Sequence, residues 1–311
     1  MSLSVPSFVV GSEDGHSRRL QLRWWHGWGP LLVLPSAVLV FAPTSWPRWA
    51  VMWSLALAIF SGCKWLTWRR TPMMGVTVSR HLGYLLAWPG MDSAAFLSSA
   101  GAATFRRPSA SEWMFAFAKT NVGACLAFFV ARNVPADWPY LAGWTGMVGI
   151  ILLLHFGSFQ LLSCAWRAVG VEARPLMNWP VVSVSLSEFW GRRWNTAFRD
   201  LTHRFLFRPL TAQVGPRAAT LVGFVVSGLV HELVISVPAG GGFGGPTLFF
   251  LLQGVGLLVE RTRFAKRIGL GHGWRGWLFT SSVLLLPVYS LFHAPFVLNV
   301  IVPFLRALGA L

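Results

Sequence analysis

Apolar residues in this chain are gathered into long runs, separated by shorter polar and basic stretches. A membrane-spanning helix needs about 20 mostly apolar residues, and runs near that length recur from one end of the chain to the other. We predict about eight spans on this basis, at 29–43, 49–66, 112–131, 139–162, 218–238, 246–260, 275–290 and 293–309. The pattern therefore predicts an all-α polytopic membrane protein.

Composition and charge support this prediction and orient the protein. The 311 residues are 54% apolar and only 12% charged, whereas a soluble domain carries about 25% charged residues. Lysine and arginine concentrate in 1–28, 64–111, 163–217 and 261–275, and the intervening loops contain only Arg48 and Arg132. Because basic loops face the cytoplasm, we expect both termini there, in the inner membrane if the source is bacterial. The net charge of +16 then needs no nucleic-acid partner.

The sequence predicts one domain that follows a polar N-terminal segment. Residues 1–22 are mixed polar, and we expect a poorly ordered cytoplasmic N-terminus there. We expect residues 23–311 to form a single transmembrane domain. Within it, the partly apolar segment 81–105 is interrupted by Trp88-Pro89-Gly90-Met91-Asp92, which predicts an interfacial or re-entrant piece rather than a full span.

A basic aromatic segment, 185–208, follows the fourth predicted span. Ser185 and Glu188 have the spacing of a capping box, so we predict that a helix starts there. At about 100° per residue, an apolar face would hold Trp190, Trp194, Ala197, Phe198, Leu201 and Phe205, and a polar face Arg192, Asn195, Thr196, Arg199 and His203. Such a helix lies at a membrane interface, either as a plain anchor or as a binding face for an anionic acyl donor.

A histidine inside the predicted span 218–238 is the strongest sign of chemistry. Ionisable groups within a membrane are costly and usually functional. The histidine, His231, shares one face of the helix with three small residues at intervals of four, Ala219, Gly223 and Ser227. This face either packs closely against another helix or leaves room for a tunnel. Glu232 follows His231, but Ile235 stands where a zinc protease motif needs a second histidine, so we predict no metal.

Three segments resemble the membrane-bound O-acyltransferase superfamily, and most closely its wax synthase branch. They are SLSEFWGRRWN at 185–195, SGLVHE at 227–232 and YLLAWPGMD at 84–92. The resemblance covers roughly 80–300, with a motif core at 176–260. It implies a fold of that superfamily with an internal tunnel, catalytic roles for His231 and Asn195, and acyl-CoA as co-substrate without any other cofactor.

The expected activity is transfer of an acyl group from acyl-CoA to the hydroxyl of a lipophilic alcohol, such as a long-chain alcohol, a sterol or a terpenoid. His231 would act as general base, and Asn195 would donate to the carbonyl oxygen or position the acceptor. We expect substrate contacts from Trp190, Arg192, Arg193, Trp194, Arg199, Ser227 and Glu232. The expected partners are acyl-CoA, the alcohol and membrane lipids, and the oligomeric state stays open.

Other functions remain open at this point. An acetyl-CoA-dependent O-acetyltransferase acting on a polycyclic natural product would have the same motifs. A small-molecule or lipid transporter is a candidate of another class, although the chain shows no matched halves with interrupted helices. A lipid-binding scaffold without catalysis is the third alternative. For His155, in the fourth predicted span, both a packing role and a contact with the substrate are open.

Overall fold

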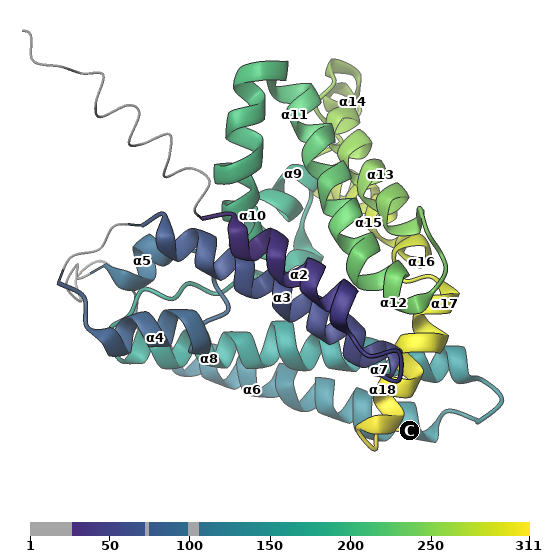
Figure 1. Ribbon diagram of the computed structural model, residues 1–311. Coiled ribbons are helices and arrows are strands. Elements are labelled where there is room, and N and C mark those ends of the chain that lie inside the picture. The colour runs from purple at the N-terminus through teal and green to yellow at the C-terminus, as the bar shows by residue number, and fades with distance from the viewer. Residues whose placement is uncertain (1–26, 72–74, 99–105) are drawn as a thin grey trace, which may run out of the picture.

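The computed structural model describes residues 27–71, 75–98 and 106–311, and every regular element in these ranges is helical. This confirms the predicted all-α class. The N-terminal segment 1–22 and the end of the predicted segment 81–105 lie outside the described residues. Figure 1 shows the arrangement of the helices.

Many of the helices are continuous α-helices, and several contain a wider π-helical turn (labelled η, as are the 3-10 turns). In chain order the elements are α2 (Gly29–Phe41), α3 (Arg48–Arg69), α4 (Val78–Ala87), α5 (Ser93–Leu97), α6 (Ala110–Cys125), η1 (Leu126–Val130), η2 (Ala131–Asn133), α7 (Pro139–Ile151), η3 (Leu152–Ser158), α8 (Phe159–Ala168), η4 (Pro180–Val182), α9 (Leu186–Glu188), η5 (Phe189–Arg193), α10 (Thr196–Thr202), η6 (His203–Phe207), α11 (Arg208–His231), η7 (Glu232–Ser236), α12 (Val237–Ala239), α13 (Gly245–Glu260), α14 (Arg263–Arg267), α15 (Gly273–Leu285), α16 (Val288–Leu291), α17 (Ala294–Phe296), η8 (Val297–Ile301) and α18 (Val302–Ala307).

The structure supports a polytopic membrane protein with fewer full-length spans than predicted. Within the described ranges, four helical stretches are long and apolar enough to cross a membrane: Arg48–Arg69, Ala110–Asn133, Pro139–Ala168 and Thr196–Ala239. A fifth results if Gly273–Leu291 and Ala294–Ala307, which are bent by 59°, form one span. The other two predicted ranges lie on α2 and α13, with 13 and 16 residues. At about 1.5 Å per residue these are shorter than the bilayer core, so the count of eight is not confirmed.

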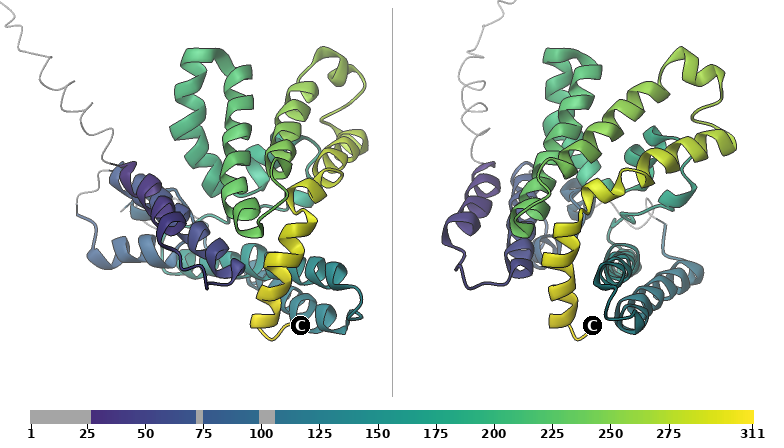
Figure 2. Two further views of the ribbon diagram at one scale, coloured as in Figure 1. Left: turned by 45° about the vertical axis from the view of Figure 1, so that its right-hand side comes forward. Right: turned by 90° about the vertical axis from the view of Figure 1, so that its right-hand side faces the viewer.

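The longest of these stretches is a helical hairpin. Gly215 has φ 79° and ψ 166°, a conformation that glycine adopts readily, and Pro216 then starts the second arm. Figures 1 and 2 show the two arms lying beside one another and joined at one end of the molecule. The second arm contains the predicted span 218–238 and carries His231 at the end of α11.

Two groups of helices enclose the motif segments. Figure 1 shows α6, α7 and α8 running together along one side, with α11, α13 and α15 above them and α9 and α10 between. In the first group the backbones approach closely at two glycines. A Cβ at Gly123 would lie 2.4 Å from the Leu153 nitrogen, and one at Gly149 would lie 2.5 Å from the Ala127 nitrogen. Small residues permit this spacing in membrane helix pairs.

The buried apolar residues form two clusters, and the motif segments lie where the clusters meet. Trp190 packs against the first cluster, which includes Phe250. Ala197 belongs to the second, together with Trp88. Val234, three residues after His231, packs against both. The fold therefore brings the basic aromatic segment and the helix that carries His231 together at the junction of the two clusters.

Candidate active site

Ser185 caps the predicted helix, and Glu188 reaches back to the residue before the cap. The Oγ of Ser185 accepts the Glu188 N–H at 2.9 Å, and the Glu188 carboxylate accepts the Val184 N–H at 2.9 Å. Burial alone raises the pKa of Glu188. The Val184 hydrogen bond and the neighbouring Arg193 outweigh that effect, so the pKa of the carboxyl lies below its ordinary value. A helix therefore starts where the sequence predicted.

The continuous helix predicted for 185–208 is wrong. The helix stops at Arg193, Trp194 is extended, and Asn195 is left-handed with φ 41° before a new helix starts at Thr196. Asparagine tolerates this conformation better than most residues. The backbone bonds explain the break, because Asn178 N–H donates to Arg193 O at 2.8 Å, as does Thr196 N–H to Leu176 O at 3.0 Å. At the break, the backbone of the segment therefore forms hydrogen bonds with the preceding loop instead of continuing the helical hydrogen bonds.

The break separates the residues that were predicted to share an apolar face. Trp194 stacks on Phe189, with ring centroids 5.5 Å apart and planes at 12°. Trp190 instead contacts Phe224 and Phe250, at 5.6 and 5.8 Å. Trp194 therefore stabilises the turn, whereas Trp190 points to the helix that carries His231 and to α13.

The three arginines of the predicted binding set have different surroundings. Arg193 forms an ion pair with Glu188 at 2.6 Å and donates to the Asn178 and Trp179 carbonyls, so it is part of the frame. Arg199 donates to the Gly191 carbonyl at 2.6 Å and pairs with the neighbouring Asp200 at 2.5 Å. Arg192 is exposed. Of the three, Arg192 and Arg199 line a cavity.

This cavity has a volume of about 390 Å³ and is built from three segments that are distant in sequence. Its lining residues are Trp88, Gly90, Met91, Asp92, Ala95, Glu172, Arg174, Pro175, Leu176, Asn178, Arg192, Thr196, Ala197, Arg199 and Asp200. The lining contains three arginines and three carboxylates, and two of the arginines are paired within the wall, with Glu172 and Asp200. The WPGMD segment, read from the sequence as a break, thus forms one wall.

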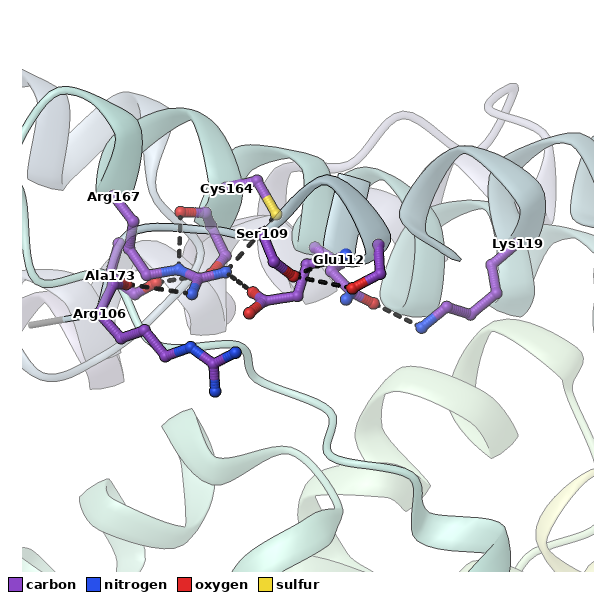
Figure 3. A network of polar contacts seen from close by, with 10 residues as sticks. Arg106, Ser109, Glu112, Lys119, Cys164, Arg167 and Ala173 are labelled. Carbon is purple, nitrogen blue, oxygen red and sulfur yellow. Dashed lines mark hydrogen bonds and ion pairs between the residues drawn. The ribbon is translucent and has the colours of Figure 1, made fainter. Parts of the chain in front are cut away.

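Buried polar contacts hold two of the cavity walls. Lys64 of α3 donates to the Gly90 carbonyl at 2.6 Å. Ser163 of α8 donates to the Ala173 carbonyl at 2.6 Å, next to Glu172 and Arg174. Figure 3 shows the adjoining network, in which Arg167 points to Glu112 of α6 and to Cys164. The loop 171–178 is therefore held on one side by the α6–α8 group and on the other side by its backbone hydrogen bonds to the motif segment.

His231 has a defined tautomer. Its Nδ1 lies 2.7 Å from the Ser227 carbonyl oxygen. A carbonyl oxygen only accepts hydrogen bonds, so Nδ1 carries the proton and Nε2 of the neutral ring keeps its lone pair. The Ser227 hydroxyl donates to the Gly223 carbonyl at 3.0 Å, so the backbone of Ser227, more than its side chain, acts on the histidine.

The closest helix contact near His231 lies off the predicted small-residue face. That contact occurs at Gly228, where a Cβ would lie 2.7 Å from the Thr247 Cα. A Cβ at Gly223 would meet nothing within 4 Å. The face is thus fully buried at Ala219 and open beside Gly223.

Glu232 has a structural partner. Its Oε1 accepts the Gly244 N–H at 2.9 Å, the Thr247 N–H at 3.1 Å and the Thr247 hydroxyl at 3.0 Å. One carboxylate oxygen thus caps the start of α13, as acidic groups at helix N-termini do. The glycine-rich loop at 240–245 serves to make this connection between α12 and α13.

One residue that the sequence did not single out joins the two motifs. The Phe250 ring of α13 lies 4.4 Å from the His231 ring and 5.8 Å from Trp190. In an apolar helix a phenylalanine carries no signal of its own, so only the packing identifies it. His155, whose role was open, lies against Phe159 at 5.3 Å. Nowhere in the described part of the chain do three His, Cys, Asp or Glu side chains gather as a metal site.

Comparison with known proteins matches the same region. Residues 173–252 match the membrane bound O-acyl transferase family. The chain is 38% identical over 165 residues to a probable long-chain-alcohol O-fatty-acyltransferase 2 of Arabidopsis thaliana, covering 48% of this chain and 46% of that protein. It is 33% identical over 133 residues to a long-chain-alcohol O-fatty-acyltransferase of Simmondsia chinensis, covering 37% of each.

A third relative has a different acceptor in its name. An acyl-CoA–sterol O-acyltransferase 1 of Arabidopsis thaliana is 35% identical over 80 residues, or 23% of each chain. The chain thus spans less than half the length of each of these three relatives. The family match shows that residues 173–252, which carry both motifs, are similar to the membrane bound O-acyl transferase family, and the relatives show that the chain is similar to long-chain-alcohol O-fatty-acyltransferases.

Proposed function

We propose that this protein transfers an acyl group from acyl-CoA to the hydroxyl of a lipophilic alcohol. The observation that carries the proposal is the His231–Ser227 hydrogen bond, which leaves Nε2 as a base in the family's motif segment. The alcohol gives its proton to Nε2. Its oxygen then bonds to the thioester carbonyl carbon, the carbon–sulfur bond breaks, and the coenzyme A thiolate leaves and recovers the proton.

Asn195 supports the same step. Its Oδ1 is directed to the Phe198 N–H, at 3.5 Å, as the cap of α10. The Nδ2 amide group then remains as the donor, and an amide N–H aimed at a developing oxyanion lowers the barrier. The left-handed backbone of Asn195 sets the direction of this side chain, so its role depends on the break in the motif.

The acyl donor is assigned to the cavity beside Arg192 and Arg199. Coenzyme A carries phosphates, which pair well with arginine. The three segments that form the cavity lie in 64–111 and 163–217, the two basic stretches assigned to the cytoplasmic side. Acyl-CoA, which is charged, would enter there without crossing the bilayer. No other cofactor is required by this scheme.

The alcohol is assigned to the membrane side. We place its path along the helix that carries His231, where Gly223, two turns before the histidine, leaves room for a substrate beside the backbone. We further propose that 23–311 form one transmembrane domain with both termini in the cytoplasm, in the inner membrane if the source is bacterial. Eight crossings would then require α2 and α13 to cross where the bilayer is locally thinned or where other helices shield them, and the two arms of the bent pair Gly273–Leu291 and Ala294–Ala307 to cross separately.

The acceptor class is the open part of this function. The relatives' names include long-chain alcohols and a sterol, so both straight-chain and polycyclic alcohols are candidates. An acetyl-CoA-dependent enzyme acting on polycyclic alcohols remains the nearest alternative. A transporter or a scaffold would bind such molecules without forming an ester.

The test is ester formation by the purified protein in lipid nanodiscs. Radiolabelled acetyl-CoA or palmitoyl-CoA is offered with hexadecanol or a sterol, and the ester is separated by chromatography. We expect ester from the wild type and a loss of about 10²–10⁴-fold in His231→Ala, the usual value of a general base. His272→Ala is the matched control, since His272 is exposed and makes no side-chain cap. Equal activity in both variants contradicts the proposal.

A further inference from the structure

Helix α13 is tied at both of its ends by carboxylates. At its start, Glu232 accepts from Gly244 and Thr247, as described above. At its end, Glu260 of α13 itself reaches the motif segment. Its Oε2 accepts the Leu186 N–H at 2.5 Å, and its Oε1 accepts the Ser187 N–H at 3.3 Å.

The Glu260 contact satisfies the start of the motif helix. The first N–H groups of a helix have no partner within the helix. Ser185 takes the Glu188 N–H, and Glu260 takes the two before it. Glu260 is only 6% exposed and Leu186 is fully buried. A charged acceptor in such surroundings forms strong hydrogen bonds, and their loss leaves buried donors unpaired.

A second contact fixes the same register. Leu186 Cδ1 would lie 2.9 Å from a Cβ at Gly256, one turn before Glu260. The absence of a side chain at 256 therefore seats Leu186 on the surface of α13. Helix α13 thus contacts the motif segment at Leu186 and at Trp190. Its Phe250, further back on the same helix, contacts both Trp190 and His231.

We propose that Glu260 is a positioning residue for acyl transfer. Its carboxylate fixes the motif segment 185–195 on α13, and α13 fixes that segment against His231. Glu260 touches no substrate in this scheme. The inference rests on the proposed function, because it assigns to Glu260 the placement of Trp190 and Asn195 relative to the base.

The donor cavity is held by other bonds. Asn178 pairs with Arg193, and Thr196 pairs with Leu176, through their backbones. Lys64 holds Gly90 on the opposite wall. Loss of the Glu260 anchor should therefore disturb the distance between the motif segment and His231 more than it disturbs the cavity. This difference separates a positioning role from a general loss of folding.

The experiment compares Glu260→Gln and Glu260→Asp with the matched control Gln253→Met. Gln253 is a fully buried polar residue of the same helix, but it donates to the Val283 carbonyl at 2.8 Å and not to the motif segment. In Glu260→Gln we expect a kcat lower by about tenfold or more, since a displacement of 1 Å suffices for such a loss. The KM for acyl-CoA should stay within about twofold, because its cavity is unchanged.

The variants make the two explanations distinguishable. Glu260→Asp keeps the charge and should restore part of the lost kcat. Gln253→Met should lower the melting temperature and leave the kcat of the folded protein unchanged. The proposal is overturned if Glu260→Gln lowers only the melting temperature, or if the KM rises while kcat is retained.

Amide hydrogen exchange provides a readout that does not depend on activity. The Leu186 and Ser187 amides should exchange faster in Glu260→Gln than in the wild type, and no faster in Gln253→Met. Equal exchange in all three proteins overturns the anchor itself. If the wild type forms no ester while the exchange differs as expected, the proposed function fails and the anchor stands.

Discussion

The Phe250 ring lies 4.4 Å from the His231 imidazole, with the two planes at 43°. The Ser227 carbonyl fixes one ring nitrogen and Phe250 covers part of the ring, so the direction of Nε2 is set from two sides. Residues that lock a catalytic group in one rotamer contribute to the rate without contacting the substrate.

Replacing Phe250 with leucine should therefore lower kcat. The smaller side chain leaves the imidazole and Trp190 less restrained, and we expect a loss of about tenfold, since small misplacements are costly in catalysis. The KM for acyl-CoA should change little. Phe249→Leu is the control, because Phe249 is equally buried. A similar loss in both variants indicates general repacking and contradicts the special role of Phe250.

Three substitutions at Asn195 separate its backbone from its side chain. Asn195→Gly keeps the left-handed conformation but removes the amide, and Asn195→Asp keeps the cap but removes the donor. Both should lower kcat strongly, by about 10²-fold if one oxyanion donor is lost. Asn195→Ala adds backbone strain of about 1–2 kcal/mol and should also lower the melting temperature. Near wild-type kcat in Asn195→Asp rules out the donor role.

The neighbouring arginines should respond differently to the same change. Arg192→Gln should raise the KM for acyl-CoA and reduce the sensitivity of that KM to salt, because exposed charge pairs are screened. Arg193→Gln breaks the ion pair with Glu188 and should lower the melting temperature instead. Steady-state kinetics at low and high salt, together with thermal unfolding, distinguish the two. An unchanged KM for acyl-CoA in Arg192→Gln would contradict the proposal that Arg192 binds the phosphates of coenzyme A.

Glu188 should make stability depend on pH in the acid range. Its pKa in the folded protein is below the ordinary value of about 4.3. A depressed carboxyl pKa contributes stability that is present above the unfolded pKa and is lost as the pH falls through the folded pKa. Wild type should therefore melt higher than Glu188→Gln at pH 6, and the difference should shrink as the pH falls below about 4. A difference that stays constant with pH contradicts this contribution.

Sidedness provides a test of the topology. In sealed right-side-out vesicles, external acyl-CoA should yield no ester until the membrane is permeabilised, because we propose that the donor cavity opens to the cytoplasm. Inside-out vesicles should be active without permeabilisation. Full activity in intact right-side-out vesicles would overturn the orientation taken from the basic loops.

Local sequence patterns determined the fold class and the main elements. The apolar runs identified the helical regions, since helix formation in a bilayer depends on run length. The Ser185–Glu188 spacing located the start of the motif helix, because a capping box acts within one turn. The intramembrane histidine and the basic aromatic segment also stood out without a structure, as residue types that are rare in their setting.

Tertiary contacts decided the rest. The break at Trp194 and Asn195 follows from backbone bonds to Leu176 and Asn178, which no helical periodicity contains. The short α2 and α13 and the 59° bend between Gly273–Leu291 and Ala294–Ala307 changed the span count, because helix lengths and bends depend on packing partners. The roles of Phe250 and Glu260 emerged only when α13 was seen to contact both motifs. Such roles arise from contacts between residues that are distant in sequence. A phenylalanine in an apolar helix, or a glutamate at the end of one, has no local pattern that predicts them.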